Sequence, residues 1–223
     1  VFALVSGMRL NAQDGTTPDT LQFAQSLAQY RYFDLGRDFI TKGIEAAKAA
    51  SDTAAVALLE FGLTEIEIEE ARTTGDPKTR AMKLKEGAAK YLAHIKKNPD
   101  DPRVAELRIT AVDLFRLGAE FLTNACKAAK EKAQQDEFRV EAKNCFSGAF
   151  EIIDIRIADL QGLAERNENE ANELKALMYS SGQLNFLYAG IFEDPKADEA
   201  SRRRDSAKNI LNDFIIEYPT EIL

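Results

Sequence analysis

A recurring helical pattern constrains the fold of this chain more than any other sequence feature. It occurs from Lys83 to Pro99 (KLKEGAAKYLAHIKKNP) and again from Arg203 to Pro219 (RRDSAKNILNDFIIEYP). Both stretches have a small residue, Gly87 or Ala207, then a large apolar residue four positions later, a second pair seven and eight positions later, and a final proline. Residues at these spacings share one face of a helix, so each stretch predicts an amphipathic helix that ends at its proline.

Two weaker copies of the pattern complete a set of four. Their small and large apolar positions are Gly36, Ile40, Gly43 and Ile44 in one copy, and Ala142, Phe146, Ala149 and Phe150 in the other. Four copies of one helical face predict a repeat protein, an elongated array in which each unit contacts its neighbours. We therefore expect one all-α domain over residues 17–219.

Turn and capping residues divide this domain into about eight helices. The expected helices are 17–30, 33–50, 53–74, 83–99, 102–132, 136–165, 167–192 and 196–217. Thr64 to Ile68 alternates polar and apolar residues as a strand does, but the flanking 3.6-residue period favours a helix there. The short loops predict four antiparallel hairpins.

A second regularity supports these hairpins. A small residue of each odd-numbered helix precedes a small residue of the next helix by a set distance, which is 12 residues from Ala24 to Gly36 and 24 or 25 residues in the later pairs. The later pairs are Gly62 and Gly87, Gly118 and Ala142, and Gly182 and Ala207. Small residues that face each other let two helix backbones approach closely.

The first spacing resembles that of the tetratricopeptide repeat, whose small positions correspond to Ala24, Gly36 and Gly43 here. The Asn-Pro and Tyr-Pro endings at Pro99 and Pro219 are similar to the terminal proline of that family. The later hairpins depart from it, since each has about a dozen extra residues between its small positions. The resemblance implies a right-handed α-solenoid of four antiparallel helical hairpins, and a scaffold rather than a catalyst.

The charge of the chain narrows the classes of partner. Its formal net charge is -8 at pH 7, whereas a general nucleic-acid binder needs a basic face to neutralise phosphates. The one basic run, Lys196 with Arg202 to Arg204, alternates with acidic residues and is typical of a solvated helix face. No glycine-rich phosphate loop follows a predicted strand. We therefore expect no nucleic-acid partner and no cofactor.

Residues 1–13 carry a separate prediction. The apolar run VFALVSGMRL precedes Asn-Ala-Gln-Asp and resembles the end of a secretory signal peptide, with Ala12 at the cleavage position. The run is too short to span a bilayer as a helix. The alternative is a short buried helix or strand of the domain. The signal-peptide interpretation predicts export to the periplasm or cell envelope of a bacterium, without an integral membrane span.

Cys126 and Cys145 are the two cysteines of the chain. They are almost equidistant from the turn that we expect at Gln134 to Asp136, so an antiparallel hairpin would bring them to the same height. In an exported protein this arrangement predicts a disulfide. The alternative is a pair of buried thiols that pack as small apolar groups.

His94 and a group of acidic residues are the remaining candidates for chemistry. His94 is the single histidine and occupies an apolar position of the repeat, which favours a packing role. One histidine cannot supply a two-histidine metal pair, and it makes a Ser-His-Asp triad unconvincing. The acidic group lacks a loop with further oxygen ligands and is interpreted as solvated surface: Glu60, Glu65, Glu67, Glu69 and Glu70. We predict no catalytic and no metal-binding residue.

Five aromatic residues are the candidates for lining a binding groove. They are Tyr30, Tyr32, Tyr179, Phe186 and Tyr188. In a helical array most aromatic residues belong to the core, which is the alternative for each of them.

Three functions stay open. The first is a non-enzymatic interaction scaffold of the bacterial cell envelope that holds a protein or peptide on the concave face of the solenoid. The second is a structural building block of a larger envelope or appendage assembly, which self-associates through an apolar last hairpin formed by Phe214, Ile215, Ile216, Ile222 and Leu223. The third is an accessory repeat domain of an exported enzyme.

Overall fold

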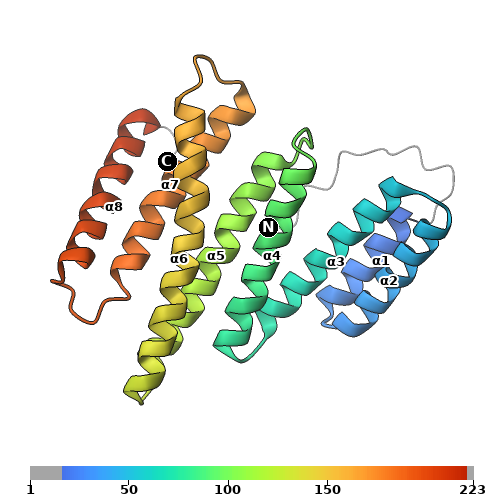
Figure 1. Cartoon of the computed structure of the whole chain (residues 1–223), viewed down its shortest axis with the longest axis horizontal. Helices are drawn as coiled ribbons and strands as arrows, with labels where there is room; N and C mark the ends of the chain where they lie inside the picture. The colour runs from blue at the N-terminus through green and yellow to red at the C-terminus, as the bar shows by residue number, and fades with distance from the viewer. Residues whose placement is uncertain (1–16, 220–223) are drawn as a thin grey trace. The chain divides into compact units, whose positions relative to one another are not determined.

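The computed structural model describes residues 17–219, and its regular elements within that range are all helices (Figure 1). The eight α-helices are α1 (Thr17–Gln29), α2 (Phe33–Ala49), α3 (Thr53–Thr73), α4 (Pro77–Lys97), α5 (Val104–Ala128), α6 (Lys132–Gln161), α7 (Glu168–Ala189) and α8 (Asp198–Glu217). The all-α prediction is confirmed for this range, and the strand-like alternation at 64–68 is helical. The predictions for residues 1–13 fall outside the described residues.

The chain divides into two compact units, one up to Glu70 and one from Ala71. The first unit contains α1, α2 and most of α3, and the second contains α4 to α8. The single domain expected over residues 17–219 stays a prediction. Within the described residues, no helix is both long enough and apolar enough to cross a membrane.

The first unit packs around the small residues predicted to face each other. A Cβ added to Gly36 would lie 3.1 Å from the carbonyl oxygen of Ala24, so α1 and α2 approach closely at the expected pair. Arg31 takes a left-handed conformation with φ 65°, which ends α1 and turns the chain sharply into α2. Ile40 of α2 and Ile66 of α3 are fully buried in the core of this unit.

The helices of the second unit pack in chain order, each against the next, and α5 also contacts α7 (Figure 1). Large apolar residues with the helical period form one continuous core between α5, α6 and α7, with Leu122, Phe146, Ile153 and Leu177 nearly inaccessible to solvent. Burial of such side chains stabilises a fold by about 1.5–3 kcal/mol each.

Capping residues explain where several of these helices begin. The side chain of Asp76 accepts a hydrogen bond from the backbone N–H of Thr79, and Pro77 occupies the first turn of α4. Asn167 and Glu170 form the predicted reciprocal cap of α7, in which each side chain accepts a hydrogen bond from the other's backbone N–H at 2.9 Å. The Asn167 prediction is therefore confirmed.

The turn between α5 and α6 lies earlier than predicted. It spans residues 129–131 rather than Gln134 to Asp136, and its sequence Ala-Lys-Glu contains no glycine, proline or capping residue. Side-chain hydrogen bonds across the turn hold it instead: the Gln135 side chain donates to Ala129 O at 2.8 Å, and Cys126 Sγ donates to Gln135 O at 3.3 Å. The residue types at positions 129–131 therefore do not mark this turn.

Small residues also mark close approaches in the second unit, but their partners differ from those predicted. A Cβ added to Gly118 would lie 3.4 Å from Cys145 Sγ and 3.5 Å from Ala81 Cα, so α4 and α6 both approach α5 there. At Gly182, an added Cβ would lie 2.6 Å from both Cγ and Cδ2 of Leu211. Leu211 thus replaces Ala207, one turn earlier in α8, as the group that packs on Gly182.

The contact between α7 and α8 yields a test of this packing. Gly182→Ala places a methyl group against the branch point of Leu211, so we expect the free energy of unfolding to fall by about 1–3 kcal/mol. Leu211→Ala removes the crowding atoms, so the double variant is expected to lose less than the sum of the two single variants. Chemical denaturation of the four proteins measures this difference, and strict additivity would contradict the contact.

Candidate groove between α5 and α7

A groove of about 640 Å³ lies in the second unit, beside the C-terminal ends of α5 and α7. We call it the α5–α7 groove. Its lining includes Glu120, Asn124 and Lys127 of α5, Phe146 of α6, Phe186 of α7, and Phe192 and Arg204 beyond α7. A smaller hollow of about 200 Å³ adjoins it and shares Thr123, Lys127, Gly190 and Phe192.

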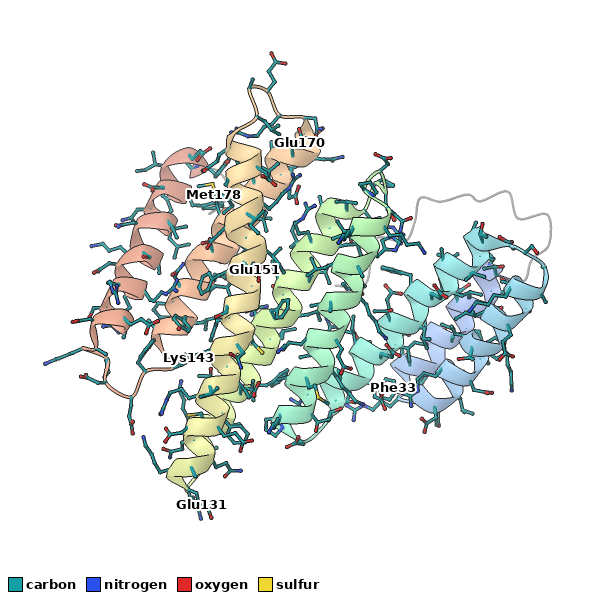
Figure 2. The ribbon with its side chains drawn as sticks, viewed as in Figure 1. Phe33, Glu131, Lys143, Glu151, Glu170 and Met178 are labelled. Carbon is teal, nitrogen blue, oxygen red and sulfur yellow. The ribbon has the colours of Figure 1, made fainter. Side chains whose placement is uncertain are left out.

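Helical periodicity places the α5 side of this groove. Glu120, Thr123, Asn124 and Lys127 follow the three- and four-residue spacing that puts side chains on one face of a helix. The buried ring of Phe146 contributes from α6. Glu131, labelled in Figure 2, precedes α6 and marks the end of the α5–α6 hairpin near which the groove lies.

A buried ion triad joins the same helices towards their other end. Glu173 of α7 is only 2% exposed, yet it pairs with Arg108 of α5 and with Arg156 of α6, whose Nη2 lies 2.8 Å from Glu173 Oε2. Hydrogen bonding to this carboxylate raises the pKa of Arg156. Two arginines on one carboxylate satisfy a charge that would otherwise be costly to bury.

The sequence offered only a weak indication of this triad. Glu173 precedes the buried Leu177 and Leu184 by four and eleven residues, which places a charged residue on the apolar face of α7. A charge at such a position predicts a buried partner, but the partners lie 65 and 17 residues away along the chain. Only the tertiary structure identifies them.

Aromatic residues form the apolar part of the groove. Phe186 is 64% exposed and contributes its side chain to the lining. Phe192 packs edge-on against Tyr188, with ring centroids 5.5 Å apart, and Lys143 Nζ lies 4.7 Å from the Phe192 centroid. Lys143 is labelled on α6 in Figure 2. The Phe192 ring is therefore held in place, whereas Phe186 is open to solvent.

Of the five aromatic residues predicted to line a groove, Phe186 lines this one. Tyr188 is instead a core residue: its hydroxyl donates to Glu199 Oε1 at 2.9 Å, and burial together with this bond raises its pKa to about 12. Tyr179 packs against Phe214 with ring centroids 5.6 Å apart. Tyr30 and Tyr32 are exposed in the first unit. Helix spacing alone did not separate Phe186 from Tyr188, two residues away.

Some polar groups of the groove already have a hydrogen-bond or ion-pair partner within the chain, and others do not. Glu120 is paired with Arg116, whose Nη1 lies 2.6 Å from its Oε1. Arg204 donates to Pro195 O and to Ser201 Oγ, which are both uncharged. The Asn124 amide and the Lys127 ammonium group have no hydrogen-bond or ion-pair partner among the described residues. An amide, two cations and an aromatic ring are therefore open to a ligand.

Comparisons with known proteins found no relative of this chain. No protein-family model matches it, and neither the curated proteins nor the solved structures include a significant match. The resemblance to the tetratricopeptide repeat therefore stays a prediction.

His94 lies near the C-terminal end of α4 and contacts the loop that leads to α5. Its Nε2 lies 2.8 Å from Asp101 Oδ2, and Arg103 Nη2 lies 2.8 Å from the same oxygen. Hydrogen bonds from Arg103 and His94 hold the pKa of Asp101 well below its usual range. The three residues connect the end of α4 to the start of α5. Within residues 17–219, no group of three or more His, Cys, Asp or Glu residues is arranged to hold a metal ion.

The acidic residues of α3 are less solvated than expected. Glu70 Oε2 lies 2.5 Å from Arg37 Nη1, and Glu65 accepts a hydrogen bond from the Gln25 side chain at 2.8 Å. Both carboxylates are half-buried and contribute to packing within the first unit.

Cys126 and Cys145 are both free thiols in the structure. Cys145 Sγ lies at the level of Gly118, which is eight residues, or about 12 Å of helix, before Cys126. The expectation of equal height is wrong, because the α5–α6 turn lies at residues 129–131 and shifts α6 relative to α5. Burial raises the pKa of the Cys145 thiol to about 11.

The two thiols are expected to differ in reactivity. Only thiolates react rapidly with alkylating reagents, so iodoacetamide should modify the half-buried Cys126 more than about tenfold faster than Cys145 in the native protein. After denaturation without reductant, both should be alkylated. Mass spectrometry of the digested protein measures this, and a peptide pair linked through the two cysteines would restore the disulfide interpretation.

Proposed function

We propose that this chain is a non-enzymatic interaction module that binds an extended peptide segment of a partner protein in the α5–α7 groove. One observation carries the proposal: the exposed ring of Phe186 and the unpaired amide of Asn124 both line a groove that is already formed. A preformed groove lowers the entropy lost on binding. A side-chain amide both donates and accepts, as a peptide bond does.

The openness of the lining favours a peptide over a small molecule. Asn124, Lys127, Phe186 and Gly190 are all exposed residues, whereas small-molecule sites bury most of the ligand surface. An apolar side chain that becomes buried against Phe186 would contribute about 1.5–3 kcal/mol. Hydrogen bonds to Asn124 would then fix the direction of the peptide backbone.

The proposal also includes features that rest on sequence alone. They are the right-handed solenoid, with this groove on its concave face, and export to the bacterial cell envelope. The first rests on the pattern of small residues, and the second on the apolar sequence of residues 1–13.

A random-peptide phage library panned on the purified protein tests the groove. We expect selected peptides to bind the wild-type chain and to lose affinity by at least about tenfold in Asn124→Trp, whose indole would fill the groove. The matched control is Asn209→Trp, which changes an exposed asparagine of α8 outside the groove. Failure to enrich any peptide, or equal binding by the two variants, would refute the proposed function.

A structural building block is the second candidate, because the last helix exposes apolar residues. Ile215 and Ile216 of α8 are 48% and 78% exposed. Phe214, which was also expected to need a neighbour, is instead buried against Tyr179 and Tyr218. Ile222 and Leu223 lie outside the described residues.

Sizing chromatography separates the two candidates. We expect an interaction module to elute as a monomer at all concentrations, and Ile216→Asp to leave the elution volume unchanged. A larger species that grows with concentration and is lost in Ile216→Asp would favour self-association through α8.

A further inference from the structure

The charges around the α5–α7 groove are unbalanced in a chain that is acidic overall. The formal net charge of the chain is -8, and yet the two acidic side chains that line the groove and its adjoining hollow are both engaged in ion pairs. Glu120 pairs with Arg116, and Glu193 pairs with Lys132 at 2.6 Å. Arg116 also pairs with Asp113, and Lys132 also pairs with Asp136.

The cations of the groove are not neutralised in the same way. Lys127 has no ion-pair or hydrogen-bond partner among the described residues. Arg204 donates only to the uncharged oxygens of Pro195 and Ser201. Arg139, in the adjoining hollow, is paired with Asp136 at 2.6 Å and does not add to the excess. Two cations of the groove, one from α5 and one from α8, therefore have no ion-pair partner among the described residues.

The end of α5 accounts for part of this arrangement. Lys127 lies in the last turn of α5, where the helix dipole favours a cation whether or not a ligand binds. Arg204 lies in α8, away from the end of α5, so the α5 dipole does not account for its position. Glu120 and Glu193 are thus paired within the chain, whereas Lys127 and Arg204 have no ion-pair partner. Two such cations complement a ligand with more than one carboxylate.

We infer that the partner of this groove is an acidic peptide segment in which a bulky apolar residue is flanked by aspartate or glutamate. The inference rests on the proposed function and specifies its ligand. The apolar residue packs against the exposed ring of Phe186, the peptide backbone pairs with the Asn124 amide, and flanking carboxylates lie near Lys127 and Arg204.

Three synthetic peptides test this inference in fluorescence anisotropy with the full chain. One has a phenylalanine between aspartate and glutamate residues, the second has asparagine and glutamine in place of the acids, and the third has lysine there. We expect the acidic peptide to bind about tenfold more tightly than the neutral one, with the difference falling as salt is added. The lysine peptide is expected to bind weakest.

A matched pair of charge reversals assigns the effect to the groove. Lys127→Glu should weaken binding of the acidic peptide by about tenfold, and that of the neutral peptide by much less, because it reverses the charge of one of the two cations without an ion-pair partner. Lys130→Glu makes the same change at an exposed lysine of the α5–α6 turn that does not line the groove. It should change the affinity for the acidic peptide by less than about twofold.

The outcomes separate this inference from the proposed function. Equal affinity for the three peptides, no binding of the acidic peptide, or equal effects of Lys127→Glu and Lys130→Glu would overturn the inference. In those cases the proposed function stands if library-selected peptides still lose affinity in Asn124→Trp. Acidic binding that is unaffected by Asn124→Trp would place the acidic peptide outside the groove and overturn the inference as well, whereas library-selected peptides that bind Asn124→Trp and Asn209→Trp equally would overturn the proposed function.

Discussion

A buried carboxylate holds the second unit of this protein together. Glu173 is removed from water and compensated by arginines from two other helices, so α5, α6 and α7 are fixed relative to one another at that level. Loss of one partner from such a buried pair typically costs several kcal/mol, because a charge is left without compensation. The α5–α7 groove lies beside two of these three helices, towards their other end.

The groove depends on the side chains that pack between the same helices towards their other end. There the contacts are aromatic and aliphatic, with Phe146, Tyr188 and Phe192 packed edge to face. Phe186 is left outside this cluster and exposed. Rigid walls combined with one open aromatic ring favour recognition, since the groove does not have to be ordered when a ligand arrives. In the proposed binding mode, the free amide orients the peptide and the cations attract its carboxylates.

Much of the fold could be predicted from residue patterns. The apolar period located the helices, Asn167 and Glu170 marked the start of α7, and Ala24 with Gly36 identified one close approach. The α5–α6 turn could not be located, because its residues favour helix and it is held by hydrogen bonds from the Gln135 and Cys126 side chains. That error of a few residues also misplaced Cys145 relative to Cys126. Of the groove residues named here, the sequence predicted only Phe186. It could not distinguish Phe186 from the buried Tyr188, because burial depends on the tertiary structure.

The sequence by itself determined that the chain is helical, where most helices begin and end, and that it is acidic overall. These properties depend on residues close together in the chain, through periodicity, capping and composition. The tertiary structure alone decided which arginines compensate Glu173, which side chain packs on Gly182, and which cations near the groove have no ion-pair partner. Each of these depends on residues far apart in sequence, whose distances no local pattern records.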